Sequence, residues 1–147
     1  MSMLPKVEIF AGLSEEEQAA LENSCVTRNY PRNTVVINEN DFADSLYVIE
    51  SGRVKVYCSD KNGKEYIMNT LGPGDYFGEL ALLDDDRRSA SVRTLEKSTF
   101  TIMFKDEFHA IMERHPNIAT TLIRNLTECI DFRVVEGAGR LELTVRK

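Results

Sequence analysis

The sequence predicts a mainly β domain: a jelly-roll-like β-roll, or double-stranded β-helix, with one helix before it and two helices after it. Short apolar or alternating segments separated by turns fill residues 30–104, which is typical of a roll of many strands. A helix-capping pattern opens residues 14–25, and apolar residues recur at helical spacing over residues 106–136. With 147 residues, 42% hydrophobic and 29% charged, the chain has the size and composition of one globular domain.

The N-terminal helix is predicted from its first turn. Ser14 is followed three residues later by Glu17, and the two form a capping box in which each side chain bonds the backbone of the other. Glu15 and Glu16 lie in the same turn, where the positive end of the helix dipole favours negative charge. We therefore expect a helix over residues 14–25 with a solvated acidic face.

The strands of the roll are predicted from alternation and from turn residues. Val54, Val56 and Cys58 alternate with polar or larger residues, as in a half-buried strand. Asn62 and Gly63 then form the turn of a hairpin, because this pair readily adopts positive φ. Strands are expected at residues 34–37, 46–49, 53–58, 65–71, 90–94 and 99–104.

Two helices are predicted after the roll. Asp106 caps a short helix that ends at His115 and Pro116, and a longer helix continues to about Glu136. The apolar stripe of the longer helix is too wide for one contact face. Part of it is expected to pack on the roll and part on a second copy of the chain, which predicts a homodimer. The stripe consists of Ile118, Leu122, Leu126, Ile130 and Val134.

These elements place residues 1–136 in one domain and leave residues 137–147 as a tail or the start of a missing segment. No apolar run approaches the ~20 residues of a membrane-spanning helix, and the N-terminus lacks the apolar stretch of a signal peptide. The three cysteines are far apart, which argues against a disulfide framework and favours the cytoplasm. Because the net charge is −6, this segment is not expected to bind nucleic acid directly.

Residues 77–92 contain the polar groups that are best suited to bind a ligand. Gly78 and Glu79 begin a short helical turn, and Arg88 follows nine residues after Glu79. A carboxylate accepts hydrogen bonds from hydroxyl groups, a guanidinium grips a phosphate through its planar fork, and backbone N–H groups at a helical start add donors for an anion. A ligand that combines a phosphate with a hydroxyl, such as a sugar phosphate or a nucleotide, fits this set.

Other interpretations of these residues are weaker. Taken alone, Glu79 and Arg88 would be an ordinary surface ion pair. The register with residues 89–92 favours a ligand site and selects Arg88 over Arg87 for the phosphate. The three aspartates at 84–86 indicate a hydrated turn more than a cation site. Histidines and cysteines do not cluster, so neither a metal site nor nucleophilic catalysis is predicted, and the chain is expected not to be an enzyme.

The segment resembles the phosphate-binding cassette of cyclic-nucleotide-binding domains, which occur in catabolite-activator-type bacterial regulators, cyclic-nucleotide-dependent protein kinases and gated ion channels. The distance from Glu79 to Arg88 matches the kinase regulatory-subunit version, whereas the catabolite-activator version is one residue longer. The resemblance covers roughly residues 4–135 and includes the turn at 72–75. The residues that match the cassette pattern are Phe77, Gly78, Glu79, Leu80, Ala81, Leu82, Arg88, Ser89, Ala90, Ser91 and Val92.

The resemblance implies a role for each part of the cassette. Glu79 would accept the ribose 2′-hydroxyl, and Arg88 would neutralise the single negative charge of a cyclic phosphate. Ser89 and the backbone N–H groups of Gly78 and Ala90 would complete the phosphate cradle. Binding would reposition the C-terminal helices. The apolar side of the pocket, near ribose and base, would consist of Val56, Met68 and Leu71.

The end of the long helix is expected to cover the purine. Its final turns carry Phe132, Arg133 and Val134, of which Arg133 is favoured. The alternative for Phe132 is that it fills the core or packs on a partner helix. In this family a hydroxyl directly after the cassette arginine can reach the amino group of guanine, and cyclic-GMP kinases carry threonine there. Cyclic AMP is favoured over cyclic GMP here, because Ser89 lacks the methyl group that fixes a threonine rotamer. No cofactor is expected beyond this ligand. The complete predicted ligand-binding set is Gly78, Glu79, Leu80, Arg88, Ser89, Ala90, Val56, Met68, Leu71 and Arg133.

Two other functions stay open at this point. The chain would fit a nucleotide-free β-roll that acts as a dimerisation or interaction module. It would also fit the sensor half of a bacterial transcription regulator. The sequence decides neither the downstream effector, nor the oligomeric state, nor whether the domain stands alone.

Overall fold

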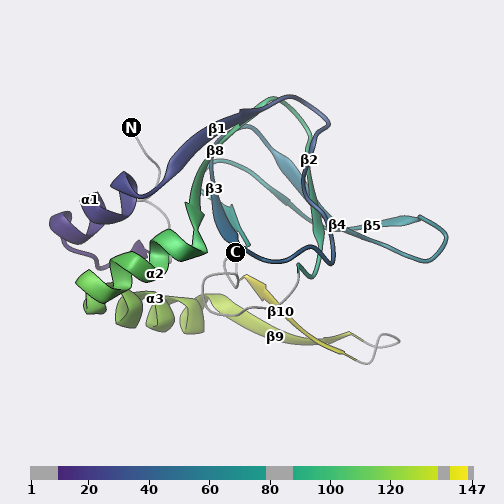
Figure 1. The fold of residues 1–147 in the computed structure, drawn as a ribbon. Coiled ribbons are helices and arrows are strands. Elements are labelled where there is room, and N and C mark those ends of the chain that lie inside the picture. Colours follow the sequence, from purple (N-terminus) through teal and green to yellow (C-terminus); the bar gives the residue numbers. More distant parts are fainter. Residues whose placement is uncertain (1–9, 79–87, 136–139, 146–147) are drawn as a thin grey trace.

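A computed structural model of the chain describes residues 10–78, 88–135 and 140–145, with side chains up to residue 125 apart from residue 123. The helices gather at one end and the strands form a twisted roll beside them (Figure 1). In chain order the elements are α1 (Glu15–Asn23), β1 (Val26–Tyr30), β2 (Val35–Ile37), β3 (Ser45–Ser51), β4 (Val54–Ser59), β5 (Glu65–Leu71), β6 (Tyr76–Phe77), β7 (Ser91–Thr94), β8 (Ser98–Phe104), α2 (Lys105–Arg114), α3 (Pro116–Cys129), β9 (Ile130–Val135) and β10 (Arg140–Val145).

Two four-stranded antiparallel sheets form the roll. Their strand orders are β1-β8-β3-β6 and β2-β7-β4-β5. Their buried side chains form a common core, in which the Tyr47 ring stacks on Phe77 at 4.9 Å between centroids and Phe100 meets both rings edge-on. The predicted mainly β fold is therefore confirmed. This core consists of Ile37, Tyr47, Ile49, Val54, Leu71, Phe77, Val92, Phe100 and Ile102.

The three helices close one end of the roll. Leu21 of α1, Phe108 and Ile111 of α2, and Ile118 and Leu122 of α3 are buried together against side chains of β3, β6 and β8. The first half of the apolar stripe on α3 therefore packs within its own chain. This agrees with the expectation that part of the stripe packs on the roll, and α2 covers the same residues.

The predicted capping box is confirmed at the start of α1. The Ser14 hydroxyl accepts the backbone N–H of Glu17 at 3.1 Å, and the Glu17 carboxylate accepts the N–H of Ser14 at 2.9 Å. The helix runs within the predicted range and ends at Asn23.

The chain after α3 differs from the prediction. The helix ends at Cys129 instead of about Glu136, and the chain continues as β9, which pairs antiparallel with β10. The predicted last turns of the helix are therefore wrong, and residues 140–145 form strand β10. Ile130 and Val134 are β-branched and favour extended backbone, so an apolar repeat of four residues did not guarantee a helix here.

Strand β1 is an element that the sequence pattern does not reveal. Val26, Thr27, Arg28 and Asn29 are all exposed, although the strand pairs with β8 along its whole length. Because β1 is an edge strand and none of these four side chains is buried, it lacks the alternation that marks a half-buried strand.

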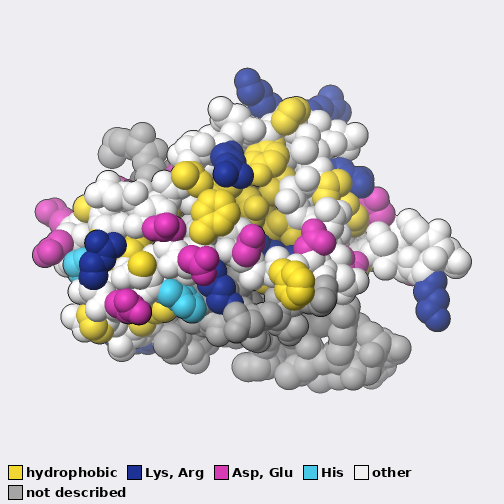
Figure 2. Space-filling model, viewed as in Figure 1, with side chains coloured by type: hydrophobic (Ala, Val, Ile, Leu, Met, Phe, Trp, Pro, Cys, Tyr) yellow, Lys and Arg dark blue, Asp and Glu magenta, His cyan; other side chains and the backbone are white. Residues whose placement is uncertain are grey.

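The hairpin of β4 and β5 projects beyond the roll, and β5 forms the outer edge of its sheet (Figures 1 and 2). The Asp60 carboxylate accepts the N–H groups of Asn62 and Lys64, both at 2.9 Å, which closes the predicted turn. Tyr66 and Ile67 on β5 are exposed, because the hairpin has left the core at this point.

A charged cluster ties the base of this hairpin to β7. Two cations lie near the Tyr57 ring on β4: Lys55 Nζ is 5.2 Å from the ring centroid and the Arg93 guanidinium carbon is 5.0 Å from it. Glu65 on β5 pairs with both cations, at 3.0 Å and 3.3 Å. The hydrogen bond from Lys55 and the charge of Arg93 lower the pKa of the Glu65 carboxyl. Three strands next to the cassette are thereby held in register.

Two glycines allow a test of close packing in the roll. Gly52 and Gly63 have φ of 94° and 81°. A Cβ on Gly52 would lie 2.6 Å from Ser98 Cα, whereas one on Gly63 would meet nothing within 4 Å. Gly63→Ala should lower the free energy of unfolding by about 1–2 kcal/mol, the cost of left-handed backbone. Gly52→Ala should lower it by about 1–3 kcal/mol more, because β8 must shift. Urea denaturation measures both; equal losses would contradict this account.

Candidate functional site

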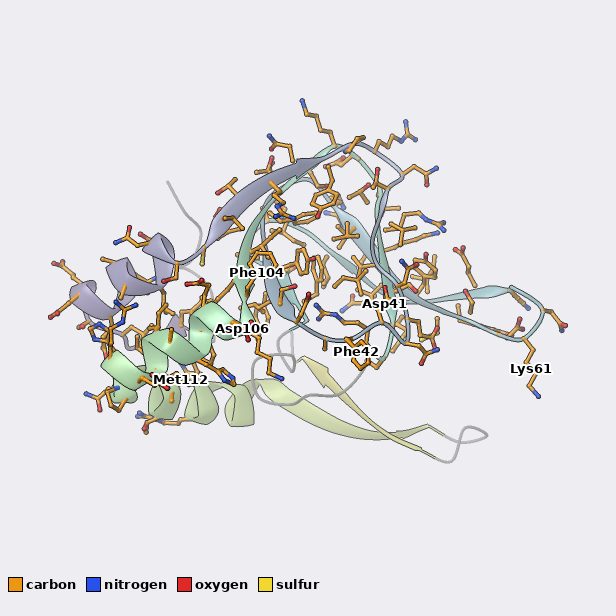
Figure 3. The ribbon with its side chains drawn as sticks, viewed as in Figure 1. Asp41, Phe42, Lys61, Phe104, Asp106 and Met112 are labelled. Carbon is orange, nitrogen blue, oxygen red and sulfur yellow. The ribbon has the colours of Figure 1, made fainter. Side chains whose placement is uncertain are left out.

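Arg88 is the centre of the site, and both of its backbone groups are fixed to the segment between β2 and β3. Its N–H donates to the Asp41 carbonyl at 2.7 Å, and its own carbonyl accepts the N–H of Asn40 at 2.9 Å. Figure 3 shows Asp41 and Phe42 on this segment, at the lower side of the roll. The cassette arginine is thus anchored before its side chain makes any contact.

The Arg88 guanidinium is buried, with 8% of the residue exposed. Its Nη2 donates to the Ser45 carbonyl at 2.9 Å and lies 3.3 Å from the Ser45 hydroxyl. The same Nη2 lies 3.5 Å from the carboxylate of Asp44. Ser45 is fully buried at the start of β3. A buried cation is costly unless it is paired and hydrogen-bonded, and these contacts meet that requirement.

Gly78 allows the guanidinium to lie against the backbone. Its φ is 80°, and a Cβ at this position would be 2.5 Å from Arg88 Nη1 and 2.8 Å from the Ser45 carbonyl oxygen. Only glycine adopts this conformation readily and leaves this space. Gly78 and Arg88 therefore meet in the structure, as the cassette pattern predicts.

The electrostatics of the site extend to Tyr47. Burial raises the pKa of the Tyr47 hydroxyl, while a hydrogen bond with Ser45 and the charge of Arg88 act in the opposite direction. The charge of Arg88 thus acts on its neighbours, and a guanidinium at this place suits an anionic ligand.

The residues after Arg88 lie beside the β4–β5 hairpin. Ser89 is exposed and Ala90 half-buried. The Cys58 thiol lies 3.5 Å from the Ser89 carbonyl oxygen, to which it donates, and 3.3 Å from Met68 Sδ. Cys58 is a neighbour of the site that the sequence interpretation missed. Its alternation with Val56 was the available signal.

The predicted apolar lining is divided between surface and core. Val56 is half-buried and packs against the core of the roll, and Met68 is largely exposed beside Cys58. Leu71 is almost completely buried and pairs with Val54 across the sheet. Val56 and Met68 thus flank the cassette side of the hairpin, while Leu71 supports them from the core.

Three predicted site residues have no described side chain. Glu79 and Leu80 lie outside the described residues. Arg133 is on β9, in register with Glu142 of β10, and not on a helix as predicted. The assigned contacts of these residues to ligand therefore remain predictions.

Metal and membrane features are absent from the part of the chain that the structure describes. There, no group of three or more His, Cys, Asp or Glu is placed to hold a metal ion. None of the helices in the same residues is long and apolar enough to cross a membrane.

Comparison with known protein families identifies the family to which the chain belongs. A family model described as the cyclic nucleotide-binding domain matches residues 27–115, which include both Gly78 and Arg88. The chain belongs to the cyclic nucleotide-binding domain family. The resemblance predicted from the cassette is thereby confirmed.

Relatives and solved structures agree with this family. The cyclic AMP receptor protein of Thermus thermophilus is 33% identical over 124 residues, which cover 82% of this chain and 57% of that protein. The N-terminal domain of a transcriptional regulator from Streptomyces coelicolor has a TM-score of 0.80 at 28% identity, covering 86% of this chain and 89% of that one. The regulatory domain of Toxoplasma gondii PKA, co-crystallised with cAMP, has a TM-score of 0.71 at 25% identity, covering 86% and 48%.

Cysteine reactivity tests the burial at the helical end of the roll, where Cys25 follows α1. Burial, with a smaller effect of the Glu22 charge, raises the pKa of the Cys25 thiol to about 12. Since only the thiolate reacts, Cys25 should be alkylated at pH 8 about 10³-fold more slowly than a free cysteine. Its rate should then rise about tenfold per pH unit up to pH about 12, as long as the fold persists. Peptide-resolved mass spectrometry after iodoacetamide treatment measures this. Rapid modification of Cys25 at pH 8 would contradict the assigned burial.

Proposed function

We propose that this chain binds a 3′,5′-cyclic nucleotide as a regulatory signal and has no enzymatic role. The buried Arg88 guanidinium, held between Ser45 and Gly78, is the observation that carries this proposal. A cyclic phosphate has one negative charge, which one guanidinium neutralises, and it offers two oxygens to the planar fork. Membership of the cyclic nucleotide-binding domain family supports the assignment.

Each part of the ligand has proposed contacts. Arg88, the Ser89 hydroxyl and the backbone N–H groups of Gly78 and Ala90 bind the phosphate. Glu79 accepts a hydrogen bond from the ribose 2′-hydroxyl, and Leu80 follows it in the same turn. These roles are transferred from the cassette pattern, and the meeting of Gly78 with Arg88 supports them.

The base and ribose are proposed to lie against the hairpin of β4 and β5. Met68 and Cys58 provide an apolar and polarisable surface beside Ser89, and Val56 pairs with Val92 of the cassette. Arg133 is a proposed contact of the purine from β9. A base covered on one side by this hairpin keeps less apolar surface in water.

Cyclic AMP is the proposed ligand, in preference to cyclic GMP. Ser89 is a serine, which lacks the methyl group that restricts the rotamer of a threonine hydroxyl. The Thermus thermophilus relative is named as a cyclic AMP receptor, and the Toxoplasma gondii domain was crystallised with cAMP. Both names support the same ligand here.

The proposed output is a movement of the C-terminal helices. Ser45 accepts a hydrogen bond from the Arg88 guanidinium, and the carbonyl of the preceding Asp44 accepts the N–H of Lys105, the first residue of α2, at 2.9 Å. One peptide segment thus connects the phosphate site to α2. A ligand that shifts the Arg88 side chain would therefore also shift α2, and with it α3, which packs beside α2.

The chain is proposed to serve as a sensor module in the cytoplasm. The aligned part of the chain spans only 57% of the Thermus thermophilus relative. The activity that the nucleotide regulates is therefore not assigned to this segment. We also propose a homodimer in which the part of the α3 stripe beyond Leu122 contacts a second copy of the chain. A segment with net charge −6 is not proposed to contact nucleic acid itself.

The phosphate role of Arg88 has a direct test. Arg88→Ala should weaken cyclic AMP binding about 10- to 100-fold, because a hydrogen bond to a charged group contributes about 1.5–3 kcal/mol. Arg88→Lys keeps the charge without the fork and should fall between Arg88→Ala and wild type. Isothermal titration calorimetry measures the affinities, and circular dichroism checks folding.

Arg87→Ala is the matched control for this test, since it removes an adjacent guanidinium. It should change the affinity by less than about threefold. If Arg87→Ala and Arg88→Ala weaken binding equally, the assigned register is wrong. If folded wild-type protein binds no cyclic nucleotide, the chain is an interaction module and the proposed function fails.

Ser89 offers a test of the base preference. Ser89→Thr should raise the affinity for cyclic GMP relative to cyclic AMP by about two- to fivefold, because a more fixed hydroxyl loses less rotamer freedom on binding. Competition of each nucleotide against a labelled cyclic AMP measures the ratio. A wild-type chain that binds cyclic GMP more tightly would reverse the assigned preference.

A further inference from the structure

Asp44 places a second charge beside the cassette arginine. Its Oδ1 lies 3.5 Å from Arg88 Nη2, and its side chain is 72% exposed while that of Arg88 is 7% exposed. The Ser45 hydroxyl donates to the same Oδ1 at 2.9 Å. The carboxylate therefore lies at the solvent side of a buried guanidinium, close enough for its charge to act on any anion that this guanidinium binds.

The orientation of Arg88 does not depend on Asp44. The bond of Nη2 to the Ser45 carbonyl is shorter, at 2.9 Å, and Ser45 is fully buried. The backbone N–H and carbonyl of Arg88 are bonded to the segment between β2 and β3. Gly78 lies against Nη1 on the other side. An ion pair whose carboxylate is this exposed adds little to such a framework.

We propose that Asp44 is a charge filter: its carboxylate lowers the affinity of the site for every phosphate, and lowers it most for phosphate dianions. This inference rests on the proposed function and concerns the same site. Coulomb energy is proportional to the charge of the ligand, so a carboxylate near the bound phosphate repels a dianion twice as strongly as a monoanion. A cyclic phosphodiester is a monoanion, whereas a linear nucleoside monophosphate carries close to two charges above pH 7.

The backbone of Asp44 is fixed, so its carboxylate stays near Arg88. Its backbone carbonyl accepts the N–H of Lys105 at the start of α2, and its neighbour Ser45 begins β3. The backbone is thus fixed on both sides. With the hydrogen bond from the Ser45 hydroxyl, this keeps the carboxylate near the Arg88 guanidinium.

The test compares wild type with Asp44→Asn, which keeps the side-chain shape and removes the charge. Three ligands separate charge from ring structure: cyclic AMP, linear AMP and the monoanionic methyl ester of AMP, all at pH 8 and low ionic strength. Asp44→Asn should tighten binding of the two monoanions about two- to threefold and of AMP about four- to tenfold, since doubling the charge squares the factor. The preference for cyclic AMP over AMP should narrow accordingly.

A matched control removes one negative charge elsewhere. Glu16→Gln lies in the exposed first turn of α1 and should leave all three affinities unchanged. The differences caused by Asp44→Asn should shrink in 0.5 M salt, because screening acts within about one Debye length, a few ångströms at that concentration.

Several results would overturn the inference. If Asp44→Asn lowers the affinity for all three ligands by the same factor, Asp44 orients Arg88 and does not discriminate by charge. If it changes none of them, the ion pair has no influence on binding. If Asp44→Asn raises the affinities for AMP and for its methyl ester by the same factor, the effect does not depend on ligand charge. In each case wild type still binds cyclic AMP and the proposed function survives; absence of any binding by wild type would defeat both.

Discussion

The burial of the Arg88 charge is the constraint on which the site depends. An unpaired guanidinium inside a protein is unstable, so its surroundings must supply acceptors. The start of β3 supplies the Ser45 carbonyl, the segment before it supplies Asp44, and Gly78 leaves the space. The roll brings these groups together from three separate parts of the chain. Its stacked core of Tyr47, Phe77 and Phe100 lies next to them and fixes the strands that carry them.

The local parts of this arrangement could be predicted from the sequence. The cassette pattern identified Gly78 and Arg88, and the capping box identified the start of α1, because each depends on residues close together in the chain. The partners of Arg88 could not be predicted in the same way. Ser45 is 43 residues away, and its shorter contact is through a backbone carbonyl, which any residue type would provide.

The errors have a common physical origin. An apolar repeat indicates burial but does not choose between helix and strand when β-branched residues carry it, as in β9. The exposure of β1 hides its period, and the nearness of Cys58 to Ser89 depends on how β4 lies beside β7. Each of these features is determined by tertiary packing. Local pattern is therefore reliable for the cassette and weakest at the edges and at the C-terminal end.

The outer edge of β5 has a consequence for how molecules of this protein meet one another. An edge strand presents backbone donors and acceptors, and Tyr66 and Ile67 add apolar surface beside them, with Ile67 65% exposed. Such an edge is a template on which a second edge can pair, extending one sheet into the next. Lys64 and Glu65 oppose this through their charges. Replacement of Ile67 by lysine would strengthen that protection without entering the core, which makes it a practical change for concentrated samples and for crystals with unwanted sheet-to-sheet contacts.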